Sequence, residues 1–343
     1  MFIQFDEIKP ILRDYNIQAE YAEALSSRAV KIHTATQHYV LKKLPKQPNP
    51  YFLQVIETLN NQRITQYVPI YKNKYDYYLS QLNNEYYYLM PYFTNGRDEE
   101  LDARHQYLFK EIANLHRRTE TEIDLKGEEA SSHYNKLSKR WNEDKTLYEQ
   151  YVEHCEKKLY LSPFELQALT YFIEVSRAID FSLSKLKEWS EAIEEKKKSR
   201  LVLNHGKISA HHFLYDENGT GYLTNFEQSK YAAPIDDMLL FMNRTASTYP
   251  TQCHDCVNWF YTYQSVYSYT NEEMLLFLSY LAYPTKIMRH IKQKVESSQR
   301  VSELSMNSKL IKSYWHFKNI EYVVMTITET EDKKKMEEAS TTE

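Results

Sequence analysis

Glycine is scarce in this chain. Only 5 of the 343 residues are glycine, whereas average usage of about 7% would give roughly 24. The five are Gly96, Gly127, Gly206, Gly219 and Gly221. Since none precedes residue 96, the N-terminal part cannot contain a glycine-rich loop of the kind that lets backbone amides approach a phosphate closely.

Cysteine and long apolar runs are also lacking. The three cysteines, Cys155, Cys253 and Cys256, are too few for a disulfide framework. The longest apolar stretch, residues 274–282, is interrupted by a serine and a tyrosine. It falls far short of the roughly 20 apolar residues that span a bilayer, so we expect no transmembrane segment.

The charge balance gives no sign of a nucleic-acid partner. The chain has 43 basic and 47 acidic residues, a net charge of -4, whereas nucleic-acid-binding domains carry clustered positive charge. The first ten residues include Asp6 and Glu7 and have no basic segment before an apolar core. We therefore expect that the chain has no signal peptide and is made and kept in the cytosol.

Tyrosine, by contrast, is abundant, with 31 residues. Two explanations stay open. The first is the codon bias of an AT-rich genome, which also favours lysine, asparagine and isoleucine. The second is a protein whose tyrosines serve adhesion or oxidative cross-linking.

Hydrophobic periodicity predicts a small mixed segment followed by a larger helical one. Up to Pro91 we expect a helix over 2–15, strands over 29–34 and 38–43, a helix over 52–60, and strands over 75–81 and 85–90. Beyond it we expect helices over 101–118, 141–160 and 163–192, a strand over 201–203, a hairpin over 213–224, and helices from 235 onward. This order indicates an α+β class, with residues 1–91 as a small N-lobe, 92–328 as a mainly helical C-lobe, and 329–343 as a disordered charged tail.

Several short segments occur in the order used by kinase-like enzymes. Lys42 ends a predicted strand and Glu57 lies on the helix that follows; in such folds a strand lysine contacts the α/β phosphates and a helix glutamate holds it. Met-Pro-Tyr at 90–92 could serve as a hinge. Residues 203–214 read Leu-Asn-His-Gly-Lys-Ile-Ser-Ala-His-His-Phe-Leu, and residues 224–227 read Thr-Asn-Phe-Glu.

These segments resemble the hinge, catalytic loop and metal loop of the aminoglycoside phosphotransferases, whose loops read His-Gly-Asp-x-x-x-x-Asn and Asp-Phe-Gly/Asp/Glu. The resemblance implies a two-lobed, protein-kinase-like α+β fold. It also places the family's catalytic aspartate at Lys207, its magnesium-binding asparagine at His212 and its magnesium-binding aspartate at Asn225. A lysine offers only donors at the base position, and an amide and an imidazole are poor replacements for the anionic oxygens that magnesium prefers.

We therefore expect a degenerate site with no catalytic residues, no metal and no cofactor; bound ATP with magnesium is the alternative. Lys42 and Glu57 would form a vestigial nucleotide site as an ion pair, with Gln54 as the competing partner one turn earlier. Lys207 would either fill the empty metal space and pair with Glu227 or Asp237, or point to solvent.

Within the superfamily the chain most resembles bacterial spore coat proteins of the CotS group, with the YutH type closest and the YsxE type next. The features that carry this resemblance are the chain length, the Tyr-Tyr-Tyr-Leu-Met-Pro-Tyr approach to the hinge at 86–92, and the helical insert around 141–189. The resemblance implies a pseudokinase that assembles with other coat proteins, made in the mother-cell cytoplasm and deposited on the spore coat. An active kinase with an unusual base and an ATP-binding scaffold remain the alternatives.

Two further clusters invite a metal-site interpretation. Cys-His-Asp-Cys at 253–256 supplies only one of the two ligand pairs that a structural zinc site uses. A second cluster would combine His205, His211 and His212 with Glu227, but these histidines are better explained as loop-packing or surface residues. The basic run at 196–200 is most simply a solvated helix end.

Overall fold

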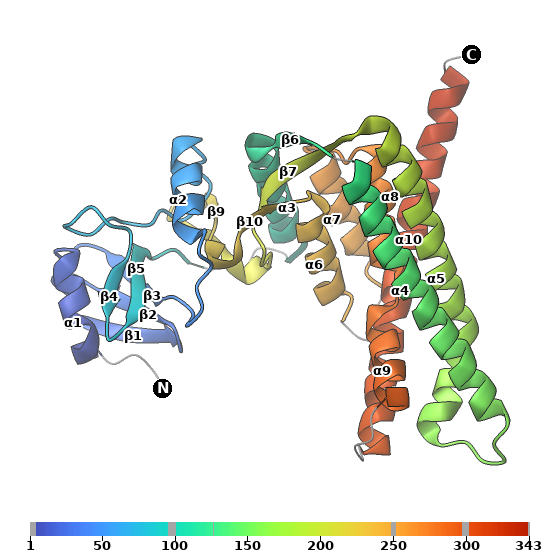
Figure 1. The fold of residues 1–343 in the computed structure, drawn as a ribbon. Coiled ribbons are helices and arrows are strands. Elements are labelled where there is room, and N and C mark those ends of the chain that lie inside the picture. The colour runs from blue at the N-terminus through green and yellow to red at the C-terminus, as the bar shows by residue number, and fades with distance from the viewer. Residues whose placement is uncertain (1–4, 95–100, 126, 248–251, 297–301, 342–343) are drawn as a thin grey trace. The chain divides into compact units, whose positions relative to one another are not determined.

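The computed structural model describes residues 5–94, 101–125, 127–247, 252–296 and 302–341 (Figure 1). The chain forms two compact units. The first comprises Met1–Glu120 with Val202–Ala232, and the second comprises Thr121–Leu201 with Ala233–Glu343. The predicted boundary at residue 91 differs from this division, which groups residues 101–119 and the loops around Lys207 and Asn225 with the N-terminal sheet.

The first unit is built on a five-stranded antiparallel sheet in the order β1-β2-β3-β5-β4. Its strands are β1 (Tyr21–Ser26), β2 (Ala29–His33), β3 (His38–Lys43), β4 (Ser80–Leu82) and β5 (Glu85–Pro91). Side chains alternate between the two faces of a strand. Leu41 therefore lies in the core formed with helix α1 (Phe5–Asp14), while its neighbour Lys42 faces the other way.

The rest of the first unit consists of helices and short strands. Helix α2 (Phe52–Asn61) buries Phe52, Val55, Ile56 and Leu59 on one side. The other elements are α3 (Leu101–Thr119), η1 (Ala210–His212), β8 (Phe213–Tyr215), β9 (Gly221–Leu223), η2 (Phe226–Gln228) and β10 (Lys230–Ala232). Strands β8 and β9 form the expected hairpin, whose turn is closed by the Asp216 carboxylate accepting from the Asn218 and Thr220 amides.

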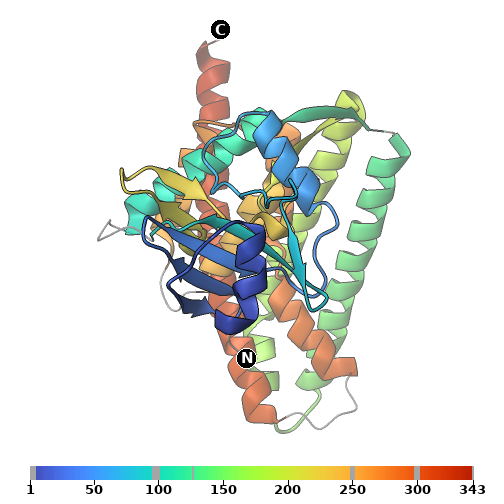
Figure 2. The ribbon, with the colours of Figure 1, turned by 90° about the vertical axis from the view of Figure 1, so that its left-hand side faces the viewer.

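The second unit is mainly helical. Its helices are α4 (Gly127–Glu156), α5 (Pro163–Lys196), α6 (Ile235–Thr245), α7 (His254–Gln264), α8 (Asn271–Ala282), α9 (Thr285–Glu296) and α10 (Glu303–Thr341). The long helices α4, α5 and α10 run side by side in both views (Figures 1 and 2), and their shared core includes Trp141, Tyr148, Phe164 and Leu310. Strand β6 (Thr121–Asp124) pairs with β7 (Lys198–Asn204), which also pairs with β10. Among the described residues, no helix is both long and apolar enough to cross a membrane.

The structure confirms the predicted α+β class. Strands β6 and β10 were not predicted, and α4 begins at Gly127 rather than at residue 141. Residues 75–79 are not a strand, because the Asn73 side-chain oxygen accepts hydrogen bonds from the amides of Tyr75 and Tyr77 and holds this segment in a loop. Strand β1 was not predicted. Residues 329–341 continue α10 rather than forming a disordered tail; residues 2–4 of the predicted first helix and 342–343 lie outside the described residues.

The α5 N-terminus generates the first prediction. The Ser162 hydroxyl accepts from the Glu165 amide, and the Glu165 carboxylate accepts from the Ser162 amide, so two otherwise unpaired donors are satisfied. We expect Ser162→Ala to lower the free energy of unfolding by about 1 kcal/mol. Ser184→Ala, an exposed position within the same helix, should be neutral or slightly stabilising because alanine favours helix. Urea denaturation of both variants checks this, and equal effects would contradict the capping role.

Candidate functional site

The site that the motifs predicted is a pocket of about 420 Å³ within the first unit. Its walls come from β1, β2, β3, β5, β8 and the two loops that resemble the catalytic and metal loops. The lining includes Arg28, Val40, Lys42, Met90, Lys207 and His212. Strand alternation explains this selection, because Val40 and Lys42 lie on the sheet face opposite Leu41. The structure therefore brings together Lys42, Lys207, His212 and Asn225.

Lys42 makes the central polar contacts of this pocket. Its ammonium forms an ion pair with the Glu227 carboxylate and donates a hydrogen bond to the Asn225 side-chain oxygen. The side chains of Lys42 and Glu227 are only 12% and 11% exposed. Tyr88, which lies opposite Lys42 in the β3–β5 register, donates its hydroxyl to Glu227 at 2.9 Å. Lys42 is thus held at a buried carboxylate.

The electrostatics of the pair follow from its burial. Desolvation raises the pKa of Glu227, but the charge and hydrogen bond of Lys42 and the Tyr88 hydroxyl lower it further, so the net shift is downward. Desolvation lowers the pKa of Lys42, and Glu227 opposes that shift without cancelling it. Burial also raises the pKa of Tyr88, which stays protonated as a donor. The carboxylate therefore remains ionised throughout the neutral range.

The predicted Lys42–Glu57 pair is wrong. Glu57 is exposed, as is Gln54, because α2 turns Phe52, Val55, Ile56 and Leu59 inward and both polar residues outward. The observed partner, Glu227, lies in η2, directly after the metal-loop position Asn225. The loop that precedes α2 contacts the segment that follows Glu227, since the Asn49 side chain donates to the Ser229 carbonyl at 2.6 Å.

The catalytic-loop segment is tied to the metal-loop segment through His205. This histidine is 1% exposed, and its Nε2 lies 2.7 Å from the Thr224 carbonyl oxygen, while its own carbonyl accepts from the Ser229 hydroxyl. Gly206 follows with φ +75°, and a Cβ there would lie 2.4 Å from the Gln228 carbonyl oxygen. Both its conformation and its close approach require glycine.

Lys207, at the position of the family's aspartate, uses its backbone rather than its side chain. Its amide donates to His205 Nδ1 at 3.2 Å and its carbonyl lies 2.7 Å from His212 Nδ1. Within the part of the chain that the structure describes, its ammonium makes no ion pair, and the proposed partner Glu227 is occupied by Lys42. Asp237 belongs to the second unit. The prediction that Lys207 pairs with Glu227 is therefore wrong.

The remaining positions do not suit magnesium. Burial lowers the pKa of His212 to about 4, so its imidazole is neutral, and its Nδ1 already bonds the Lys207 carbonyl. Asn225 adopts a left-handed conformation at φ 72°, and its side-chain oxygen accepts from Lys42. Magnesium favours free, anionic oxygens, and these residues offer none. Among the described residues, no three histidine, cysteine or acidic side chains are grouped as a metal site.

Sequence reasoning did not place Tyr88 in the site, and it assigned Glu227 to Lys207 rather than to Lys42. Glu227 could have been found from its place in the metal-loop motif. Tyr88 could not be singled out, because it stands in a run of three tyrosines at 86–88 and only the sheet register distinguishes them.

Removing the Glu227 charge tests the pair. We expect Glu227→Gln to lower the free energy of unfolding by about 2 kcal/mol at pH 7, because a buried ammonium loses its counter-charge. Glu57→Gln, the matched change on the exposed face of α2, should stay within about 0.5 kcal/mol of the wild type. Chemical denaturation of both variants measures the difference, and a larger effect at Glu57 would contradict the assignment.

The pH dependence of the same variant has a defined sign. The folded-state pKa of Glu227 lies below its usual value of 4.5, so its stabilising effect is present above that pH and is lost as the pH falls through the folded pKa. The stability gap between wild type and Glu227→Gln should therefore be largest at neutral pH and shrink below about 4.5. A gap that grows in acid would show that the carboxylate is not stabilised by Lys42.

Comparison with known protein structures identifies the fold of this chain. No family model matches this chain, and no curated protein sequence matches it. An aminoglycoside phosphotransferase from Alicyclobacillus acidocaldarius is similar in structure, with TM-score 0.67 and 13% identity over 93% of this chain and 95% of that one. The AMP-bound spectinomycin phosphotransferase APH(9)-Ia is also similar, with TM-score 0.54 and 15% identity over 94% of this chain and 98% of that one. A microcompartment-associated aminopropanol kinase has TM-score 0.53 and 13% identity over 89% of this chain and 93% of that one. The chain therefore has the protein-kinase-like fold of the aminoglycoside phosphotransferase type.

Proposed function

We propose that this protein is a pseudokinase: a kinase-like fold that acts through protein contacts and does not transfer phosphate. The observation that carries the proposal is the buried contact of Lys42 with Glu227 and Asn225. In working kinases the corresponding lysine is held by a glutamate on a helix while it contacts the nucleotide phosphates, whereas here Glu57 on that helix is exposed and Lys42 is held by the segment that follows the metal-loop position. Here a phosphate would have to take Lys42 away from a carboxylate that is itself buried, and breaking such a pair leaves an uncompensated charge.

The chemistry of the neighbouring positions supports the same conclusion. A lysine at the position of the family's base cannot accept a proton from a substrate hydroxyl while it is charged. Loss of a general base alone costs about 10²–10⁴ in rate. The side chains of His212 and Asn225 are already engaged by the protein and do not supply the oxygens that would hold magnesium.

The biological setting is proposed from the sequence resemblance. The chain resembles spore coat proteins of the CotS group, so we propose that it is a structural or assembly component of the coat. It would be made in the mother-cell cytoplasm and placed on the spore by contacts with other coat proteins.

A second candidate is a scaffold that binds a nucleotide without magnesium. Arg28, Lys42 and Lys207 line one pocket, and its described lining contains no aspartate or glutamate. A cluster of cations attracts a polyphosphate, and Lys207 would supply the positive charge that magnesium supplies in the enzymes. Binding would require Lys42 to exchange Glu227 for phosphate.

Thermal unfolding with ATP separates these functions. For the pseudokinase we expect no increase in Tm with ATP, with or without magnesium. A nucleotide that did bind would stabilise the folded protein by about 2.7 kcal/mol at 100 times its Kd, so binding would be detected. An increase without magnesium that is lost in Lys42→Met, but kept in the neighbouring Lys43→Met, supports the scaffold. Lys43 is the matched control because it pairs with Glu85 and does not line the pocket. A magnesium-dependent increase, or transfer of radiolabelled phosphate that Lys42→Met abolishes, would overturn the pseudokinase proposal.

Reversion of the site gives the complementary prediction. Lys207→Asp, His212→Asn and Asn225→Asp together restore the acidic and amide oxygens of the family's loops. We expect this triple variant to gain a magnesium-dependent increase in Tm, because the surrounding backbone already has the required loops and Asn225→Asp also tolerates the left-handed conformation. If the folded variant binds no magnesium, the loss of metal binding does not reside in these three side chains.

A further inference from the structure

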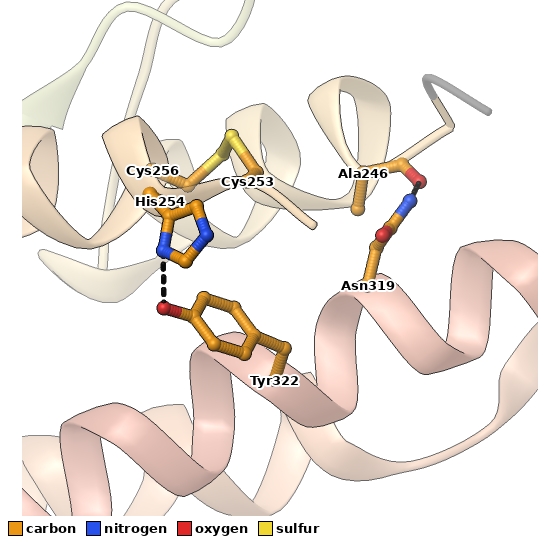
Figure 3. Close-up of a disulfide and its surroundings, with 6 residues drawn as sticks. All are labelled: Ala246, Cys253, His254, Cys256, Asn319 and Tyr322. Carbon is orange, nitrogen blue, oxygen red and sulfur yellow. Dashed lines mark hydrogen bonds between the residues drawn. A yellow bond between two sulfur atoms is a disulfide. The ribbon is translucent and has the colours of Figure 1, made fainter. Parts of the chain in front are cut away.

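Outside this pocket, Cys253 and Cys256 are joined by a disulfide at the first turn of α7 (Figure 3). Cys253 is the N-cap residue and Cys256 lies three residues later, with 5.2 Å between their Cα atoms. Helical spacing places residues i and i+3 next to each other. This spacing places the two sulfurs within bonding reach of each other.

The two cysteines differ in their exposure. Cys253 is half-buried, whereas Cys256 is 1% exposed. His254 and Asp255 between them are exposed, while the next turns of α7 bury Val257, Trp259 and Phe260. An incoming thiolate can therefore reach Cys253 more readily than Cys256, which makes Cys256 the leaving sulfur on reduction and the attacking sulfur on reoxidation.

The backbone of this turn suits a thiolate. The N-cap side chain makes no hydrogen bond to the first turn of α7, so the amide groups there are not satisfied by a side-chain cap. Unsatisfied amides and the helix dipole stabilise negative charge at a helix N-terminus, and cysteines placed there are more reactive. Asp255 adds a negative charge in the same turn and opposes this effect.

Contacts with α10 hold the region independently of the disulfide. The Asn319 side chain donates to the carbonyl of Ala246, just after α6, at 3.1 Å. The Tyr322 hydroxyl and His254 Nδ1 lie 2.5 Å apart, with their rings edge to face (Figure 3). Because α6 and α7 are each joined to α10 in this way, opening the disulfide need not release the helix.

Other uses of these cysteines fit less well. A zinc site needs about four ligands, and no group of three potential ligands exists among the described residues. The third cysteine, Cys155, is fully buried in α4, where burial raises the pKa of its thiol. It is therefore a poor competitor for exchange. A disulfide that closes so short a loop also constrains the unfolded chain less than one that closes a long loop.

We propose that Cys253 and Cys256 form a redox-active pair that exchanges with accessible dithiols. One thiolate of the dithiol attacks Cys253 Sγ, forming a mixed disulfide and releasing Cys256 as a thiolate, which takes up a proton. The second thiolate of the dithiol then attacks the dithiol sulfur that is bonded to Cys253. This step releases Cys253 as a thiolate, which also takes up a proton. Two electrons pass to the protein, which gains two thiols, and the dithiol becomes a disulfide. The reverse sequence reduces a substrate disulfide.

Equilibration of the full chain in glutathione buffers tests the proposal. We expect the pair to convert from disulfide to two thiols within the range of these buffers, as counted by acid quenching, alkylation and mass measurement, with unchanged far-ultraviolet circular dichroism. A disulfide that resists reduction until denaturant is added, or helix content lost on reduction, would identify a structural disulfide and overturn the proposal. Dithiothreitol and a small protein dithiol, used at equal concentrations, distinguish the source of the reductant; failure of both also overturns it.

Single variants test the asymmetry. Cys256→Ser leaves Cys253, and Cys253→Ser leaves Cys256, each with Cys155 as an internal buried reference. We expect Cys253 to form a mixed disulfide with oxidised glutathione about tenfold or more faster than Cys256 does. Equal rates, or a faster Cys256, would overturn the assigned roles. Asp255→Asn should speed the reaction of Cys253, because it removes a negative charge from the same turn.

Discussion

An ammonium group that is almost sealed from water requires a counter-charge nearby, and in the first unit this requirement is met by Glu227. Strand alternation points Lys42 away from the α1 core, and the buried carboxylate it meets belongs to a segment about 180 residues further along the chain. Tyr88 supports the carboxylate from the neighbouring strand. This one contact joins β3, β5 and η2, so two parts of the chain that are distant in sequence share one polar centre.

The surrounding contacts show why the arrangement is consistent. His205 and Ser229 link the catalytic-loop segment to the metal-loop segment, and Gly206 allows their backbones to approach. The two loops are therefore held by hydrogen bonds and packing that do not depend on a nucleotide. Lys42 can therefore be paired with a carboxylate without loss of the fold.

The sequence predicted the parts of this structure where periodicity is clear. In β2 the buried Val30 and Ile32 alternate with the partly exposed Ala29 and Lys31, and α5 begins with a proline behind a serine cap. Strand β1 was missed because nearly all of its residues are exposed and it has no inward-facing pattern. The motif order located the pocket. Glu57, however, could pair with Lys42 only if α2 turned this residue inward, and it does not. Its apolar stripe places Glu57 about 140° away from Phe52, a signal that was present and outweighed by analogy. The disulfide could not be inferred from spacing alone, since two cysteines three residues apart also suit a metal or free thiols.

Helix α10 is 39 residues long, and its two halves are stabilised in different ways. Val323 and Ile327 are buried, so amides around them open only when the packing of the helices opens. Residues 332–340 are exposed on every side, apart from tethers such as Lys334 over the Tyr261 ring. A short stretch of exposed helix is marginal on its own. Its amide protons will therefore exchange by fraying, and a protease will trim this end long before it cuts the packed half.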